Sequence, residues 1–223
     1  ENFPMKCAKL ALGYMIDRPK ISALDLGCAV GRSSFELASE FDSVHGLDFS
    51  ARFIRVAFQM KQKGRIHFEL QEEGDIVSYH EKDLEEFGLE QFNHKVEFFQ
   101  GDASNLKSQF TGYDLILAAN LIDRLSDPVK FLTTIHTRLN TNGLLVLTSP
   151  YTWLEEFTKK TNWVGGIRKD GEPYSTLEGL QDILSRHFKM LDSPRDIEFV
   201  IRETRRKFQH TISQMTVWEK IKD

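Results

Sequence analysis

A short segment near the N-terminus combines an acidic residue with small residues at a regular spacing. Asp25 is followed by Gly27, Ala29 and Gly31, and the apolar residues 21–26 around it predict a buried strand. Glycine has no Cβ, so the backbone can turn sharply here and a ligand can approach it closely. A helix is predicted directly after the bend, and its first amide groups have no partner within the helix. The segment therefore predicts a strand–turn–helix unit that receives polar ligand atoms; the alternative is a tight turn without a ligand.

Two further acids follow predicted strands. Asp48 ends the strand predicted over residues 44–48, and Asp102 lies just after the strand predicted over residues 96–100. In open α/β sheets ligands bind beyond the carboxyl ends of the strands, so both acids belong to the same edge as the bend. Asp48 lies where the hydroxyls of a ribose would be held. For Asp102 the alternative is an acid that stabilises a helix N-terminus.

The bend resembles the nucleotide-binding turn of class I S-adenosylmethionine-dependent methyltransferases, in which an acid is followed by x-Gly-x-Gly-x-Gly. The middle glycine is Ala29 in this chain, which keeps the position small. The resemblance implies S-adenosyl-L-methionine as the cofactor and S-adenosyl-L-homocysteine as the product. It places Asp102 at the adenine amino group and the Ala103 amide against the ring. The cofactor-binding residues that it implies are Asp25, Gly27, Cys28, Ala29, Gly31, Arg32, Asp48, Phe49, Asp102, Ala103 and Asn120.

Predicted strands and helices alternate along most of the chain, which is typical of an α/β fold. With an antiparallel pair at the end, their order resembles the plan of class I methyltransferases, and the resemblance implies a Rossmann-like class I methyltransferase fold. It has a seven-stranded, mostly parallel sheet with an antiparallel last strand and helices on both faces. The predicted strands cover residues 21–26, 44–48, 96–100, 113–120, 144–148, 188–191 (continued by 197–204) and 212–220. The predicted helices cover residues 3–16, 32–38, 51–63, 83–92, 128–142 and 176–187.

A segment of about residues 66–92 is an insertion that a minimal fold of this class does not need. Residues 66–70 and 76–80 alternate in polarity around Gly74 and Asp75, which predicts a small β-hairpin after the second strand and its helix. The acidic residues that follow favour a solvated face or a docking surface.

Length and composition narrow the class of protein. The 223 residues suit one catalytic α/β domain over 1–223, and the net charge of −4 argues against a nucleic-acid partner. No apolar run is long enough for a membrane span, and no metal-ligand spacing is present. The two cysteines favour a reducing compartment, so we expect a cytoplasmic protein. The chain begins at Glu1, and we expect it to be excised from a longer bifunctional polypeptide.

A closer resemblance lies in the C-terminal third. Residues 151–156, 163–166 and 199–209 are similar to the methyltransferase domain of ovothiol biosynthesis, which is usually the C-terminal part of 5-histidylcysteine sulfoxide synthase. The resemblance implies methylation of an imidazole nitrogen of 5-thiohistidine (4-mercaptohistidine) to give ovothiol A. It also implies docking against an N-terminal sulfoxide synthase domain, and no iron chemistry in this part.

Side chains of this region, with Asn120, are candidates for the acceptor site. Asn120 ends the apolar strand that precedes it, where cofactor and acceptor should meet, and Tyr151 follows the fifth strand on the same side, so both are predicted to be catalytic. Arginine suits a substrate carboxylate, glutamate an ammonium group and tryptophan a flat ring; surface ion pairs and core packing are the alternatives. The predicted substrate-binding residues are Tyr151, Trp153, Glu155, Glu156, Arg202 and Arg205.

The expected mechanism places few demands on the protein. A sulfonium methyl group is already electrophilic, so the site must hold an acceptor lone pair roughly 3 Å away and in line with the breaking bond. A neutral imidazole nitrogen has that lone pair and an imidazolium does not, so we expect the substrate as a thiolate with an unprotonated ring nitrogen. Three alternatives remain open: another small-molecule acceptor, a nicotinamide-dependent oxidoreductase, and a non-catalytic docking domain.

Overall fold

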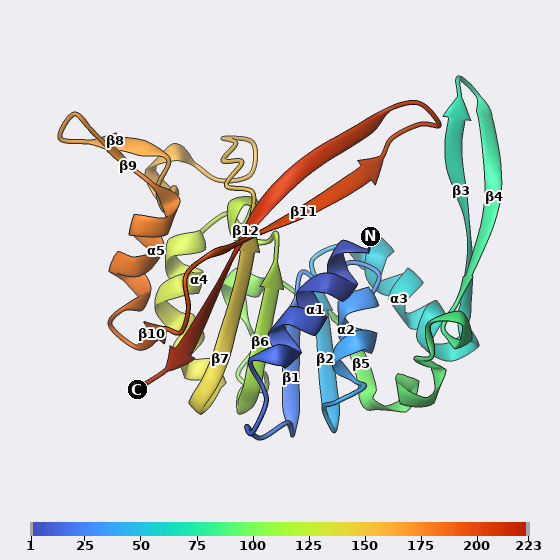
Figure 1. Ribbon diagram of the computed structural model, residues 1–223, viewed down its shortest axis with the longest axis horizontal. Helices are drawn as coiled ribbons and strands as arrows, with labels where there is room; N and C mark the ends of the chain where they lie inside the picture. Colours follow the sequence, from blue (N-terminus) through green and yellow to red (C-terminus); the bar gives the residue numbers. More distant parts are fainter. Residues whose placement is uncertain (1, 222–223) are drawn as a thin grey trace.

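The computed structural model describes residues 2–221, and its centre is one large β-sheet (Figure 1). The strand order is β10-β12-β7-β6-β1-β2-β5, and β11 pairs with β12 as an eighth strand. The five strands from β7 to β5 are parallel, whereas β12 runs antiparallel to its neighbours. The strands of this sheet are β1 (Ser22–Leu26), β2 (Ser43–Asp48), β5 (Val96–Gln100), β6 (Tyr113–Ala119), β7 (Leu139–Ser149), β10 (Phe188–Met190), β11 (Arg195–Arg202) and β12 (Phe208–Lys220).

Helices cover both faces of the sheet, as predicted. Alternate side chains of β6 enter two separate hydrophobic clusters: Ile116 and Ala118 face one, and Leu115 and Leu117 face the other. Because successive strand residues point to opposite faces, an apolar strand such as β6 must be covered on both. The α-helices are α1 (Phe3–Gly13), α2 (Arg32–Leu37), α3 (Ala51–Lys63), α4 (Pro128–Thr134) and α5 (Thr176–Leu184). The 3₁₀ helices are η1 (Glu85–Phe87), η2 (Glu90–Lys95), η3 (Ala103–Asn105), η4 (Ile122–Arg124), η5 (Ile135–Arg138) and η6 (Lys160–Asn162).

The prediction of one helix over residues 128–142 was wrong over residues 139–142. The α-helix ends at Thr134, the 3₁₀ helix η5 continues to Arg138, and Leu139 begins β7 by pairing with Tyr113 of β6. Asn142 and Gly143 lie inside this strand, at a bulge where the register shifts before Leu144. The helical spacing of apolar residues was real, but pairing with the central strand decides the conformation of Leu139.

The predicted helix over residues 83–92 was also wrong. Asp83 ends a strand, and η1 and η2 follow it on either side of Gly88, whose φ of 68° interrupts a helix. The predicted hairpin is confirmed and is longer than expected, with β3 (Arg65–Glu73) and β4 (Ile76–Asp83). A second small hairpin, β8 (Ile167–Lys169) with β9 (Glu172–Tyr174), lies in a region where neither strand nor helix was predicted.

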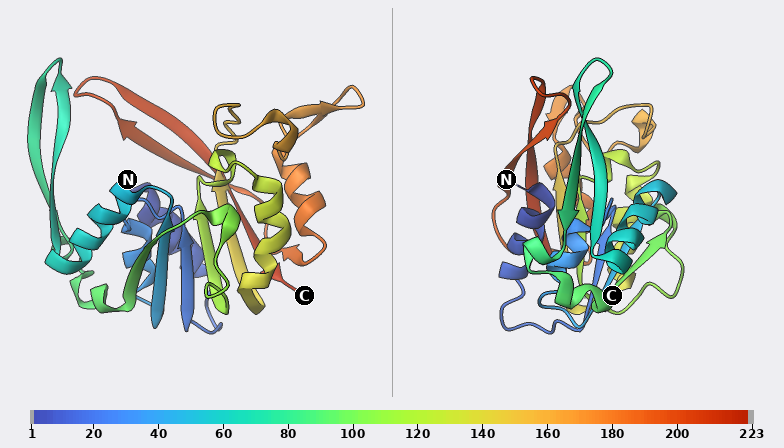
Figure 2. Two further views of the ribbon diagram at one scale, coloured as in Figure 1. Left: turned by 180° about the vertical axis from the view of Figure 1, so that it is seen from behind. Right: turned by 90° about the vertical axis from the view of Figure 1, so that its right-hand side faces the viewer.

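Two long hairpins project from the same end of the body (Figures 1 and 2). They are β3–β4 and the outer part of β11–β12, and their tips lie side by side. Arg202 Nη2 donates to Glu72 Oε1 at 2.6 Å, and the Arg205 amide donates to the Glu72 carbonyl at 3.3 Å. Arg206 and Glu73 form a more exposed pair at 3.2 Å. Opposite charges therefore join segments that are about 130 residues apart in sequence.

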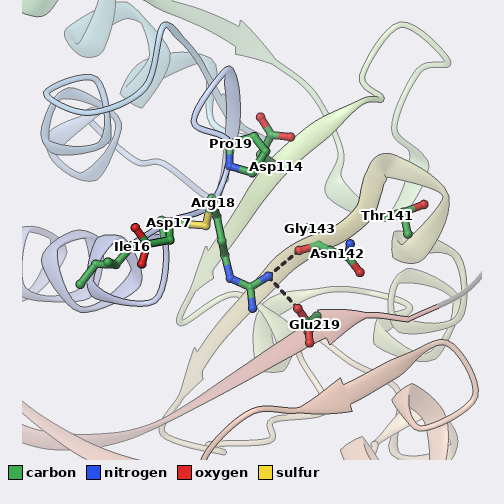
Figure 3. Close-up of a pocket in the computed structure, with 10 residues that line it drawn as sticks. Ile16, Asp17, Arg18, Pro19, Asp114, Thr141, Asn142, Gly143 and Glu219 are labelled. Carbon is green, nitrogen blue, oxygen red and sulfur yellow. Dashed lines mark hydrogen bonds and ion pairs between the residues drawn. The ribbon is translucent and has the colours of Figure 1, made fainter.

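The amino-end edge of the parallel strands holds a cavity of about 440 Å³ (Figure 3). Arg18 crosses it and bonds the Asn142 carbonyl at 2.8 Å and Glu219 at 2.7 Å. Asp114 accepts hydrogen bonds from the Ile21 amide and from Asn140. These contacts tie the segment between α1 and β1 to β6, β7 and β12, so they hold it against the sheet. Within residues 2–221, no helix is long and apolar enough to cross a membrane.

Candidate cofactor and acceptor site

A cavity of about 620 Å³ lies at the opposite edge, where the parallel strands end. Its volume falls in the range of roughly 300–1,000 Å³ that is usual for small-molecule sites. The wall combines the β1–α2 loop, the segments that follow β2, β5 and β6, and the loop after β7. The predicted site residues that line it are Gly27, Ala29, Asp48, Phe49, Asp102, Ala103, Asn120 and Glu156.

The β1–α2 loop turns through left-handed backbone conformations. Gly27, Ala29 and Gly31 have φ values of 71°, 48° and 89°. The amides of Gly27 and Cys28 both donate to the Leu47 carbonyl, at 2.8 and 3.1 Å, which fastens the loop to β2. Glycine adopts such conformations without strain, whereas alanine does not.

We expect Ala29→Gly to stabilise the protein. The φ of 48° places the Ala29 Cβ in a left-handed conformation that costs about 1–2 kcal/mol, and the greater chain entropy of glycine offsets about half of that. The free energy of unfolding should rise by about 0.5–1 kcal/mol, measured by chemical denaturation. Ala38→Gly is the control, since Ala38 has an ordinary φ of −64°; it should destabilise instead. Equal destabilisation by both changes would contradict the assignment of strain to Ala29.

Asp48 joins the loop to the end of β2. Its Oδ2 accepts a hydrogen bond from the Ala29 amide at 2.9 Å, and its Oδ1 accepts one from the Ser50 amide at 2.8 Å. A carboxylate offers about four lone-pair sites, so each oxygen can accept a second bond from a ligand in the cavity.

Asp25 lies beneath the loop rather than in the cavity wall. It is only 1% exposed, and its Oδ2 accepts hydrogen bonds from the Ser33 and Ser34 hydroxyls, both at 2.6 Å. Burial raises the pKa of the Asp25 carboxyl to about 6, against the lowering effect of the two hydroxyls. Asp25 therefore connects β1 to the start of α2.

The raised pKa of Asp25 predicts a pH dependence of stability. Between pH 3.8 and about 6 the folded protein keeps a proton on Asp25 that the unfolded chain releases, so the free energy of unfolding falls as pH rises. Asp25→Asn has no such proton. The stability of this variant relative to the parent should therefore increase by on the order of 1–3 kcal/mol from about pH 4 to pH 7, in urea titrations. A difference that stays constant with pH would contradict the raised pKa.

Asp102 and Ala103, which the resemblance assigns to the adenine, line the cavity together with two exposed rings. Asp102 Oδ1 accepts a hydrogen bond from the Ser104 amide at 2.8 Å and so caps η3. Phe49 is 77% exposed and Phe53 is 44% exposed, and both line the cavity. Asp102 can therefore cap the helix and also bind the adenine amino group, because its second oxygen can still accept a hydrogen bond.

Asn120 and Tyr151, the two predicted catalytic residues, have unusual backbones. Their φ values are 52° and 54°, which asparagine tolerates and tyrosine adopts rarely. Asn120 lines the cavity, whereas Tyr151 does not; its hydroxyl donates to Gln214 Oε1 at 3.1 Å, and burial raises its pKa. Strain of this kind is concentrated at functional sites, so it marks both positions for testing.

Three residues assigned to the cofactor or acceptor lie outside the cavity wall. Cys28 is buried, with its Sγ 3.8 Å from the Ala29 carbonyl. Arg32 pairs with Glu36 and lies 3.8 Å above the Phe87 ring. Trp153 is buried and donates from Nε1 to Thr176 at 2.9 Å, which is core packing rather than an exposed stacking surface.

Four more predicted site residues do not line the cavity. Gly31 is the N-cap of α2 and faces Phe98, and Glu155 is exposed beside the wall residue Glu156. Arg202 and Arg205 lie at the hairpin tips and contact Glu72. Arg202 thus uses its charge between the hairpins, and Arg205 contributes its backbone amide.

Arg124 lines the cavity and was not predicted from sequence. Its Nη1 donates to Asp123 Oδ2 and to the Thr152 carbonyl, each at 2.9 Å, and Nη2 donates to Thr152 Oγ1 at 3.0 Å. Its guanidinium carbon lies 4.9 Å from the Phe157 ring centre. In sequence, an Asp-Arg pair in a loop has no signal that separates it from a surface ion pair. Here Asp123 is buried, so the arginine is held in one orientation at the cavity wall.

Comparisons with known proteins agree with this geometry. Residues 17–181 match a family described as a methyltransferase domain. A search of curated protein sequences found no match. Among solved structures, the N-methyltransferase NodS from Bradyrhizobium japonicum, in complex with S-adenosyl-L-homocysteine, has a TM-score of 0.58 at 14% identity, covering 98% of this chain and 86% of that one.

Two further solved structures have the same fold. A SAM-dependent methyltransferase from Methanosarcina mazei has a TM-score of 0.59 at 20% identity, covering 92% of this chain and 95% of that one. An S-adenosylmethionine-dependent methyltransferase from Clostridium acetobutylicum has a TM-score of 0.61 at 14% identity, covering 100% and 93%. The strand order, the match over residues 17–181 and these similarities agree, and the chain belongs to the methyltransferase domain family.

Proposed function

We propose that this protein is an S-adenosylmethionine-dependent methyltransferase that binds its cofactor in the cavity of about 620 Å³. One observation carries the proposal: the β1–α2 bend, Asp48 and Asp102 line a single cavity at the carboxyl edge of the sheet. This is where open α/β sheets bind nucleotide-like ligands.

The residues present fit this cofactor. A Cβ on Gly27 would lie 3.1 Å from Leu121 Cδ1, so the glycine leaves room at the cavity wall. Asp48 keeps lone pairs for the ribose hydroxyls, and Asp102 can accept a bond from the adenine amino group. The exposed rings of Phe49 and Phe53 offer flat apolar surface beside that group.

The chain's own residues have to position an acceptor. Bound S-adenosylmethionine supplies an electrophilic methyl group, so the wall must hold a lone pair about 3 Å from it and in line. Asn120, Arg124, Ser126 and Glu156 are polar wall residues apart from the proposed ribose and adenine contacts, and they are the candidates for this task. Leu121 and Leu125 add apolar side chains to the same wall.

For the acceptor we propose 5-thiohistidine, methylated on an imidazole nitrogen. The similarity of residues 151–156, 163–166 and 199–209 to the ovothiol methyltransferase domain supports this choice. Among the predicted substrate residues, Glu156 lies at the cavity and suits the substrate ammonium group. Arg124 takes the carboxylate role that the sequence assigned to Arg202 and Arg205, because its Nε–H has no partner among residues 2–221.

Two assays test the two levels of the proposal. Calorimetry should detect binding of S-adenosyl-L-homocysteine and no binding of NAD. A methyl-transfer assay with labelled cofactor should then give product from 5-thiohistidine and little from histidine. Absence of heat with S-adenosyl-L-homocysteine would contradict the cofactor site, whereas binding without transfer to 5-thiohistidine would contradict only the acceptor.

A further inference from the structure

The side chain of Asn120 is held by hydroxyl groups from two neighbouring strands. Thr148 Oγ1 of β7 donates to Asn120 Oδ1 at 3.0 Å, and Ser213 Oγ of β12 donates to the same oxygen at 2.7 Å. Both hydroxyl residues are fully buried. The amide of a cavity residue is therefore fixed by a strand that lies 93 residues further along the chain.

In the structure the side-chain oxygen of Asn120, and not its NH₂ group, faces the strands. Thr148 Oγ1 accepts the Asn120 backbone N–H at 3.1 Å, so its own hydrogen is free to be donated. In the structure both hydroxyls contact the side-chain oxygen of Asn120, which accepts from each of them, whereas the NH₂ group could accept from neither. With both lone pairs of Oδ1 used by hydroxyls, the two Nδ2 hydrogens are left for the cavity that Asn120 lines.

Ser213 occupies the point where β12 leaves the body of the sheet. From Gln214 onward β12 pairs with β7, whereas at Ser213 it pairs with Ile197 of β11 alone. The β11–β12 hairpin thus contacts the cavity residue Asn120 through the buried Ser213 hydroxyl at its base.

We infer that Ser213 is a positioning residue that holds Asn120 with its amide hydrogens directed into the cavity. This inference rests on the proposed function of that cavity. Two N–H donors bind a carboxylate or another anionic group and cannot act as a base. The group is either the carboxylate of the cofactor or an anionic group of the acceptor.

A double-mutant cycle tests whether Ser213 acts through Asn120. Ser213→Ala, Asn120→Ala and the double variant are compared by calorimetry with S-adenosyl-L-homocysteine and by steady-state kinetics with 5-thiohistidine. In the parent protein, Ser213→Ala should raise either the Kd for S-adenosyl-L-homocysteine or the KM for 5-thiohistidine by about fivefold or more. In the Asn120→Ala variant, the same substitution should change that constant by less than about twofold. Weaker binding of S-adenosyl-L-homocysteine identifies the cofactor carboxylate, and a raised KM alone identifies the acceptor.

Controls separate this role from a general loss of stability. Thr216→Val removes another buried hydroxyl of β12, one that contacts Trp218, and should leave both constants unchanged. Ser213→Cys keeps the shape with a weaker donor; it should be intermediate, and it replaces Ser213→Ala if that variant does not fold. Equal effects of Ser213→Ala with and without Asn120, or no effect at all, would overturn the inference.

A readout independent of function covers the case in which the cofactor proposal fails. The Asn120 Nδ2 signals in nitrogen-15 NMR are assigned by their loss in Asn120→Ala. They should shift or broaden in Ser213→Ala and stay in place in Thr216→Val. Unchanged signals in Ser213→Ala would overturn the positioning role even if no ligand binds.

Discussion

Gly179→Ala should strongly destabilise the protein, although alanine is the better helix former. Gly179 lies within α5, where the exchange alone would stabilise by about 1 kcal/mol. An added Cβ would lie 1.7 Å from the carbonyl oxygen of Val164, which is backbone and cannot rotate away. Overpacking of this kind costs about 1–3 kcal/mol or more, so we expect a net loss of about 2 kcal/mol and a Tm lower by about 5 °C.

Gly13→Ala is the matched control for this prediction. Gly13 is the last residue of α1, and a Cβ there has no neighbour within 4 Å. The free energy of unfolding should therefore stay unchanged or rise by up to about 1 kcal/mol. Thermal unfolding of the two variants in parallel isolates the close contact. Similar stabilities would mean that α5 can move away from Val164 at little cost.

The close contact between Gly179 and Val164 gives a structural reason for the glycines in residues 163–166, one of the segments similar to the ovothiol methyltransferase domain. Gly165 packs against the Ser175 carbonyl, where a Cβ would lie at 2.3 Å, just as Gly179 packs against Val164. The two glycines allow the segment before β8 to lie against the start of α5 without side chains between them. The segment over residues 163–166 is thus a packing element behind the site, and Trp163 stacks on the buried Trp153.

Local signals predicted the elements that form the cofactor half of the site. The bounds of β5 are those expected, and α3 covers the predicted residues 51–63, between the N-cap Ser50 and the C-cap Gly64. The signals here are short in range: an apolar run, a cap and a glycine. Since the carboxyl ends of parallel strands share one edge, Asp48 and Asp102 could be placed together from sequence.

Long-range contacts decided what the sequence could not predict. The arginines of the last hairpin contact Glu72, and no periodicity relates the two hairpins. Arg124 reaches the cavity because the buried Asp123 and Thr152 orient it, and Ser213 contacts Asn120 only through sheet pairing. Each of these contacts depends on how segments that are distant in sequence pair in the fold. The pattern of residues along the sequence does not contain that information.

Asp48→Ala should remove most of the affinity for S-adenosyl-L-homocysteine. The carboxylate holds the Ala29 amide at 2.9 Å, so its loss releases the loop as well as the proposed ribose contact. Hydrogen bonds to a charged group contribute about 1.5–3 kcal/mol each, which predicts affinity lower by about 30-fold or more in calorimetry. Asp48→Asn should be nearly as weak, because its NH₂ group would face either the Ala29 or the Ser50 amide, donor against donor.

Asp127→Ala provides the comparison that makes the Asp48 result specific. Asp127 also accepts a hydrogen bond from a backbone amide, that of Lys130 at 3.0 Å, but it caps α4 and does not line the cavity. Its loss should lower the free energy of unfolding by about 1 kcal/mol and leave ligand affinity unchanged. If Asp48→Ala bound S-adenosyl-L-homocysteine as tightly as Asp127→Ala, the ribose would have to be held elsewhere. Asp48 would then serve only to hold the β1–α2 loop, through the Ala29 amide.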